Sequence, residues 1–366
     1  MNIFHYKKQQ GLTIIEIMIA ILLSTLLLTG VIQIFVSTKH SYRIQDGLSR
    51  IQENGRFGIQ MISQDVQMGG FYGCNDGQII TNHLNDSTDL QFQYDYSIAG
   101  YNDLTSTPAL LTSANTSITP DTGTDVIIIR RPEGEPYRLA GISTKDNITI
   151  EAPSVISNLC NNSATMVNGF CPGDIMLVAD CNKSIVFQSG TFTVSGTPPN
   201  RIATITHPTG STPGNSKDEW GGVSDMPNQF ANDANSVVYH LATIMYYVQT
   251  VNGIPTLFRY QNGDFDALVD GVEDMQIQYG EDTNNDGIAD SYVDAFAYDA
   301  TTQARWNSIV ATKIKLLIRS VNNNLTEQTL SYSFNGNTVT TANMASDDKY
   351  IRREFVTTVA LRNHAS

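Results

Sequence analysis

The chain has 366 residues, of which 41% are hydrophobic and 16% charged, a composition typical of a folded protein. Its formal net charge is −14. Because nucleic acid phosphates are bound mainly by lysine and arginine, this acidic balance argues against a nucleic acid partner. The sequence contains no nucleotide-binding, zinc-protease or serine-hydrolase motif, and its six histidines are scattered. We therefore expect no enzyme activity.

The N-terminus joins a short basic leader to an apolar segment of membrane length. Lys7 and Lys8 precede Leu12–Val36, in which Glu16 is the only charged residue. As a helix this segment would be about 37 Å long, enough to cross a hydrocarbon core of about 30 Å. The two lysines favour a cytoplasmic N-terminus. The segment is too long for the core of a secretory signal peptide, and no A-x-A cleavage pattern follows it.

Glu16 is unexpected in such a segment. A carboxylate within a spanning helix costs about 2.5–3.5 kcal/mol, less near the helix end, and it usually faces a partner. Cleavage after Gly11 would create such a partner, the α-amino group of Leu12, which Glu16 could meet on a neighbouring subunit. The alternative is an ordinary membrane anchor in which Glu16 reaches back to the lipid headgroups.

The leader, the glycine and the glutamate five residues later resemble the class III leader of type IV pilins and pseudopilins. Gly11, Leu12 and Glu16 occupy the three characteristic positions, although Leu12 replaces the more usual phenylalanine or methionine. The resemblance implies cleavage after Gly11 and N-methylation of Leu12 by a prepilin peptidase. It also implies that Glu16 sets the register of the subunit during assembly.

The helix is predicted to continue beyond the membrane, to about Met68. One face carries an apolar stripe that consists of Ile44, Leu48, Ile51, Ile59, Ile62 and Val66. Gly55 lies on the same stripe, where close packing is possible, and Gly69-Gly70 is a plausible helix stop. We expect three parts: the cleaved leader 1–11, the helix 12–70 with its membrane-spanning part 12–36, and a head 71–366. A division of the head into two lobes near residue 236 is one interpretation.

The head is predicted to be rich in strands. The expected strands are Val126–Arg130, Ile175–Val178, Ile185–Phe187, Thr191–Val194, Val237–Val248, Thr256–Tyr260, Met275–Tyr279, Ile314–Val321, Leu330–Phe334 and Glu354–Leu361. A helical turn is expected at Phe265–Val272, and the polar stretches 82–124 and 195–235 are expected to be long loops. The predicted fold class is therefore α+β and pilin-like, with a long N-terminal helix packed on a large, mainly antiparallel β-rich head.

Four cysteines follow the membrane segment, where an oxidising periplasm would allow disulfides. Four cysteines allow three connectivities, which the sequence does not decide. We favour Cys160–Cys171, which closes a short loop, together with Cys74–Cys181. A zinc site is disfavoured because no C-x-x-C pattern occurs and no histidine lies near these cysteines.

An acidic loop in the head resembles a calcium-binding loop. Its candidate ligands are Asp282, Asn284, Asp286, the carbonyl of Ile288, and Asp290, with Gly287 at the turn. Val293 stands where such loops carry a bidentate glutamate, and Asp294, Asp274 or Glu281 could substitute for it. The alternative is a hydrated Asx-turn loop between two strands. Calcium is the one cofactor that the sequence suggests.

Short segments in the head resemble PilW-type minor pilins. They are Gly69–Cys74, Gly173–Cys181, Val272–Gly280 and Arg353–Asn363, and their order along the chain makes the resemblance persuasive. It implies a structural protein of the inner membrane that joins other minor pilins in a priming complex and then stays at the pilus tip, often with a large adhesin. The implied partners are other minor pilins, the major pilin, a tip adhesin and the prepilin peptidase; the implied processes are cell adhesion and twitching motility.

Two other interpretations remain open at this point. A minor pseudopilin of a type II secretion system shares the leader and the head architecture. A membrane-anchored periplasmic calcium-binding hydrolase would explain the anchor and the acidic loop without any assembly role.

Overall fold

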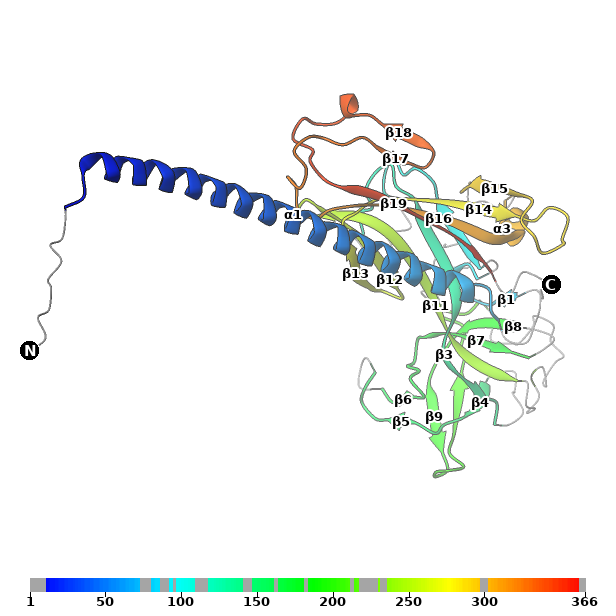
Figure 1. Cartoon of the computed structure of the whole chain (residues 1–366). Helices are drawn as coiled ribbons and strands as arrows, with labels where there is room; N and C mark the ends of the chain where they lie inside the picture. The colour runs from blue at the N-terminus through cyan, green and yellow to red at the C-terminus, as the bar shows by residue number, and fades with distance from the viewer. Residues whose placement is uncertain are drawn as a thin grey trace, which may run out of the picture.

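The structure is a computed structural model that describes residues 11–72, 80–85, 92–94, 97–108, 118–140, 147–160, 164–180, 184–210, 214–216, 230, 236–296 and 302–361. The long helix α1 (Ile14–Met68) leads into a large β-rich head. The first half of α1 extends away from the head, and the second half lies along it (Figure 1). The α+β, pilin-like fold class predicted from the sequence is confirmed.

The second half of α1 packs on the head through its apolar stripe, which includes a glycine. Ile51, Gly55 and Ile62 are buried, as the stripe predicts. Gly55 lies directly against the ring of Phe355, where even a Cβ atom would overlap with the ring. The helix ends at Gly69, and the following Gly70 has a φ of 73°, a conformation that favours glycine.

Two sheets and the helix enclose the main core. The first sheet contains β1 (Ile80–Asn82), β2 (Ile98–Tyr101), β3 (Val126–Arg138), β7 (Ile175–Ala179), β8 (Ser184–Gln188), β11 (Val237–Val251), β12 (Ile254–Gln261) and β13 (Asp264–Asp270). The second contains β14 (Val272–Glu281), β15 (Ser291–Asp294), β16 (Ile309–Arg319) and β19 (Arg352–Ala360). All pairs are antiparallel except β1 with β8.

Smaller elements complete the head. A third sheet has the order β4 (Asn147–Glu151), β10 (Ile202–Thr206) and β9 (Phe192–Ser195). Two hairpins are formed by β5 (Val155–Ile156) with β6 (Met166–Val167), and by β17 (Tyr332–Phe334) with β18 (Asn337–Val339). The short helices are α3 (Gln303–Asn307) and the 3₁₀-helix η3 (Thr341–Asn343).

Strand β11 is shared by different parts of the head. One edge pairs with β3, and the opposite edge pairs with β7 over Val237–His240 and with β12 over Ile244–Val251. Its side chains enter three hydrophobic clusters, one under α1 and one on each face of β7 and β8. The division of the head near residue 236 stays a prediction. Strand β11, which begins at Val237, pairs with β3 and β7 from before this position and with β12 from after it.

Some local expectations were wrong. The segment 265–272 is not a helical turn, because Asp264–Asp270 forms β13 and pairs with β12. The stretches 82–124 and 195–235 are not loops throughout, since β2 and β10 lie within them. In both cases pairing with a neighbouring strand decides the local structure, and the local composition does not.

A buried carboxylate anchors the end of α1 to the first sheet. Asp65 is 6% exposed and accepts hydrogen bonds at Oδ1 from Arg131 Nε (2.9 Å) and at Oδ2 from Tyr246 Oη (2.6 Å) and Arg259 Nε (3.0 Å). These partners come from β3, β11 and β12. Burial and the Asp65 charge raise the pKa of Tyr246, which therefore stays a hydrogen-bond donor.

A second buried carboxylate links β3 to β14. Asp125 is 1% exposed and accepts hydrogen bonds from the backbone N–H groups of Asp103 (2.8 Å) and Ile277 (2.7 Å). Burial raises the pKa of Asp125 to about 7, against the opposing effect of these two hydrogen bonds. Burial also raises the pKa of the neighbouring Asp274 to about 6. Both carboxyl groups are therefore easier to protonate in the folded chain than in the unfolded chain.

We expect Asp65→Asn to lower the free energy of unfolding by about 3–5 kcal/mol, because it leaves two partly buried arginines without their counter-ion. The matched control is Asp46→Asn on the same helix, which breaks an exposed pair with Arg50 worth about 0.3–0.5 kcal/mol. Thermal unfolding of the full chain in detergent measures both effects. Equal midpoints for the two variants would contradict the anchoring role of Asp65.

The stability of the head should fall as pH rises from about 5 to 8. Between the unfolded pKa of about 3.9 and the raised pKa of Asp125, the folded chain binds more protons, so each pH unit costs at most about 1.4 kcal/mol per group. Glu133, whose pKa the neighbouring His240 (Nδ1 to Oε2 3.7 Å) lowers to about 2, stays ionised throughout this range. Unfolding midpoints should therefore decrease with pH, and Asp125→Asn should flatten the slope.

The control for this series is Asp264→Asn, which removes an exposed carboxylate on β13 and should leave the slope unchanged. A midpoint that rises with pH over the same range would contradict the assignment of the slope to Asp125 and Asp274.

Candidate assembly site

The candidate assembly site lies at the first turn of α1. Thr13 is the N-cap residue, and its backbone N–H (2.9 Å) and its hydroxyl (2.7 Å) both donate to Glu16 Oε2. The Glu16 N–H in turn faces the Thr13 hydroxyl oxygen at 3.4 Å. This reciprocal capping box satisfies N–H groups that a helix start leaves without partners.

The capping box could have been found in the sequence, because Thr13-x-x-Glu16 is the T-x-x-E pattern that precedes an apolar run. It gives Glu16 a role within its own chain in addition to the expected one between subunits. A glutamate at the third helical position also interacts favourably with the positive end of the helix dipole.

The other polar side chains of the apolar segment are satisfied by their own helix. Ser24 donates to the carbonyl of Ala20 (2.7 Å), Thr25 to that of Leu22 (2.9 Å) and Thr29 to that of Thr25 (2.8 Å). Such bonds allow hydroxyls to enter lipid at little cost. The Glu16 side chain differs because it is ionisable, and hydrogen bonds from Thr13 do not neutralise a carboxylate.

The apolar segment has the properties of a membrane span. Within the described residues α1 is the one helix long and apolar enough to cross a membrane, and its large side chains from Leu12 to Val36 are exposed. Lys7 and Lys8 lie outside the described residues. Cleavage after Gly11 and methylation of Leu12 stay predictions, and they would bring a new amine within two residues of the capping box.

The disulfide expected between Cys160 and Cys171 is present, with a Cα–Cα distance of 5.6 Å across a sequence separation of 11. It closes the β5–β6 hairpin, and the Cys171 N–H then donates to Asp174 Oδ2 (2.8 Å) at the start of β7. The predicted Cys74–Cys181 pair lies outside the described residues.

The acidic loop lies between β14 and β15, as the sequence suggested. Both oxygens of Asp282 accept backbone N–H groups: Oδ1 from Asn285 (2.7 Å) and Oδ2 from Gly287 (2.8 Å). Asn284 Nδ2 lies 3.2 Å from Asp286 Oδ2 and 3.4 Å from Asp290 Oδ1. The loop places Asn284 beside Asp286 and Asp290 and forms the Asx turns of the alternative interpretation. Among the described residues no three carboxylate, histidine or cysteine side chains are grouped as a metal site needs.

The three substitutes for the twelfth calcium ligand are engaged elsewhere. Glu281 forms a bidentate ion pair with Arg305 (2.7 and 2.9 Å), Asp274 accepts from Gln276 (3.0 Å), and Asp294 accepts from Gln278 (3.3 Å). Val293 packs against the main core. Calcium binding stays a prediction, which calcium titration of the full chain against a chelated reference would test.

Comparison with known protein families gives two matches. Residues 245–363 match the family described as type IV pilus-assembly protein W (PilW), and residues 6–32 match the prokaryotic N-terminal methylation motif. The first match covers β12–β19 and the end of β11, and the second covers the leader with the start of α1. No curated protein and no solved structure matches the chain.

The matches include the leader and two of the four head segments in which the sequence resembled a pilin, Val272–Gly280 and Arg353–Asn363. The fold is the long helix with a β-rich head that fits a pilin. PilW proteins are structural assembly proteins, and a leader with an apolar helix anchors such a protein in the inner membrane. Together the two matches support a PilW-family pilin with a class III prepilin leader and a minor pilin role in the type IV pilus.

Proposed function

We propose that this minor pilin helps to prime pilus assembly in the inner membrane and then remains at the pilus tip with other minor pilins and a tip adhesin. The family match favours the pilus over the type II secretion alternative. In the membrane the N-terminus would be cytoplasmic and the head periplasmic, an environment that suits the Cys160–Cys171 disulfide.

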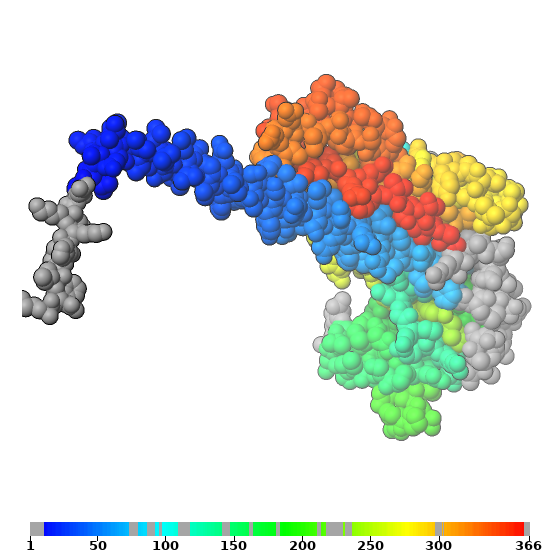
Figure 2. All heavy atoms as spheres, in the orientation of Figure 1, coloured from blue at the N-terminus to red at the C-terminus, as the bar shows by residue number. Residues whose placement is uncertain are grey.

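The bulk of the head is the observation that supports a position at the tip. Figure 2 shows α1 running across the head, with β19 on one side of it and the part that contains β4–β10 on the other. A helix of about 10 Å in diameter therefore carries a head that is much wider than the helix on both sides. Repeated along a filament of packed helices, such heads would crowd one another, whereas at the tip the space above the subunit is free.

The outer face of α1 offers a surface for neighbouring pilins. Phe57 and Met68 are 44% and 40% exposed although they lie on the half of α1 that packs on the head. They are 11 residues apart, which is about three turns, so they share one face of the helix. Exposed apolar side chains along one face are typical of a surface that another helix covers.

Glu16 would then act at the moment of assembly. The free amine of a processed neighbour can compete with Thr13 for its carboxylate, and an ion pair in a low-dielectric environment is stronger than a hydrogen bond to a neutral group. A subunit at the wrong height would leave the carboxylate without this partner, at a cost of the order of 2.5–3.5 kcal/mol. Glu16 would thus select the register of the helix.

We expect Glu16→Ala to be processed but excluded from pili. Intact mass of the membrane form should show loss of residues 1–11 and a gain of about 14 Da for one methyl group, provided that the prepilin peptidase is present. Immunoblots of sheared pili should lack this variant. Ser24→Ala is the matched control because Ser24 bonds only to its own helix, and it should enter pili normally. A leader retained in the presence of the peptidase would refute pilin-type processing.

Priming and tip location predict a second outcome. Deletion of the chain should reduce the number of pili per cell more than their length, because nucleation fails while elongation by the major pilin is intact. Antibodies against the head should label pilus ends in electron micrographs. Label spaced along the shaft, or an unchanged number of pili in the deletion strain, would contradict the proposal.

A further inference from the structure

The first sheet contains a fork where two strands separate on the same edge of β11. The edge pairs with β7 up to His240 and with β12 from Ile244, so Leu241–Thr243 lies between the two ladders. We call these three residues of β11, with the ends of β7 and β12 beside them, the fork. Backbone groups inside a sheet need partners, and here no strand can supply them because β7 and β12 diverge.

Asn262 fills the backbone positions that the fork leaves open. The Thr243 N–H donates to its side-chain oxygen (3.0 Å), and its amide nitrogen lies 3.4 Å from the Leu241 carbonyl. Asn262 belongs to the turn between β12 and β13 and has a φ of 48°, which asparagine tolerates better than most residues. The Asn262 backbone N–H also donates to the Thr243 carbonyl (3.4 Å), so this one residue takes the place of a strand beside Leu241–Thr243.

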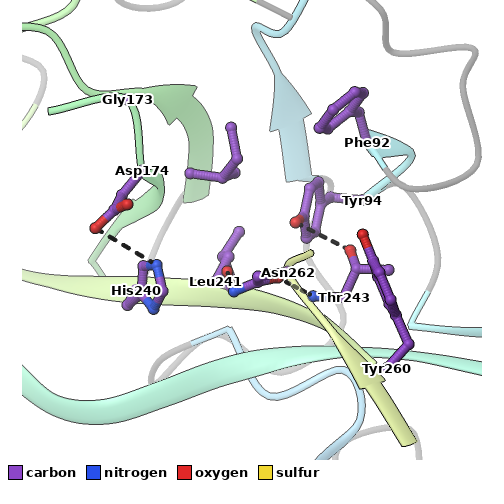
Figure 3. Close-up of a pocket in the computed structure, with 10 residues that line it drawn as sticks. Phe92, Tyr94, Gly173, Asp174, His240, Leu241, Thr243, Tyr260 and Asn262 are labelled. Carbon is purple, nitrogen blue, oxygen red and sulfur yellow. Dashed lines mark hydrogen bonds and ion pairs between the residues drawn. The ribbon is translucent and has the colours of Figure 1, made fainter. Parts of the chain in front are cut away.

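A pocket of about 230 Å³ lies at the fork (Figure 3). Phe92, Tyr94 and Tyr260 line one side, and Asp174 at the start of β7 lines the other. Leu241 and Thr243 point to one face of the sheet and His240 to the opposite face, since side chains alternate along a strand, so the pocket reaches through the fork. Tyr94 and Tyr260 are 2% and 3% exposed, which places them deep in its wall.

The pocket combines aromatic walls with polar groups and has little net charge. The Thr243 hydroxyl donates to Tyr94 Oη (3.1 Å). Asp174 Oδ2 accepts the Cys171 N–H and lies 3.7 Å from His240 Nε2, while Asp174 Oδ1 has no hydrogen bond from the part of the chain that the structure describes. The described lining residues include no lysine or arginine. An anionic ligand would therefore meet a carboxylate and no cation.

We propose that the pocket at the fork binds one neutral, polyhydroxylated ring, the chemistry of a terminal monosaccharide. Its apolar C–H face would pack on the aromatic side, and its hydroxyls would bond to Asp174 and to the polar atoms around Thr243. This pairing of aromatic area with a few convergent polar groups is what fixes the orientation of small ligands in proteins. The volume admits one ring, since pockets for larger ligands hold about 300–1,000 Å³.

A purely apolar ligand would leave Asp174 desolvated and unpaired, which is costly. An ammonium ligand would suit aromatic rings beside a carboxylate, but Asp174 Oδ2 already accepts the Cys171 N–H, which makes the carboxylate a weaker counter-ion. The neutral ring is the class that uses both sides of the pocket. The inference does not depend on tip location, because the pocket belongs to the isolated head.

The test is ligand-observed saturation-transfer NMR on the full chain in detergent. The probes are the neutral methyl glycosides of glucose, galactose and mannose, with glucuronate as the anionic probe and choline as the cationic probe. At least one neutral glycoside should give a saturable signal, and glucuronate should bind more weakly than its neutral counterpart.

Asp174→Asn and Phe92→Ala should each weaken binding at least about fivefold, through the loss of a charged acceptor or of aromatic contact. Asn can still accept the Cys171 N–H, so the loop before β7 should persist. Asp264→Asn, the same change at an exposed site on β13, should bind as the unsubstituted chain does. Unfolding midpoints show whether each variant is folded.

Three results would overturn the proposal. They are the absence of saturable binding by any neutral glycoside to folded protein, binding that survives both pocket substitutions, and binding of choline alone. None of them would affect the proposed priming role, which is measured in cells by pilus number and pilus content.

Discussion

The helix α1 must be stable in two environments, lipid along its first half and the protein head along its second half. The arrangement of the rest of the structure depends on this constraint. Its first half is long and apolar enough to cross a membrane and carries one carboxylate, Glu16, whose hydrogen-bond partner among the described residues is Thr13. Its second half is covered by the head and carries Asp65, which two arginines and a tyrosine of the same chain surround. The chain thus completes the environment of Asp65 by folding, whereas we propose that another subunit completes that of Glu16.

This difference explains why the sequence indicated a role for Glu16 but not for Asp65. Glu16 stands alone in an apolar run, so its position is informative without any structure. Asp65 lies in an ordinary amphipathic stretch, and its partners Arg131 and Arg259 are 66 and 194 residues away. Periodicity predicted α1 with its buried stripe, and most of β14 and β16 was expected as the strands Met275–Tyr279 and Ile314–Val321. The pairing that assembles a buried ion cluster is set by sheet topology, which local patterns do not contain.

The errors have the same origin. Phe265–Val272 has a sequence suited to a helical turn, but the hairpin after Asn262-Gly263 aligns Leu257 with Val269, so the segment becomes the edge strand β13. The exposed acids Asp264 and Asp266 on this edge discourage pairing with further strands. The calcium motif was recognisable because its ligands are local, and so was its departure at Val293. The engagement of the substitute Glu281 by Arg305 on α3 was not, because it joins residues 24 positions apart.

The fork joins the part of the head that matches the family model to the part that does not. The match begins at Met245, one residue after β11 begins to pair with β12, whereas β7 and its neighbouring strands precede it. An assembly role requires only α1 and the sheets that cover it, because these carry the membrane segment and the helix surface. The pocket for which we propose ligand binding lies where the two parts meet, beside Asn262, which bonds to the backbone of β11 there.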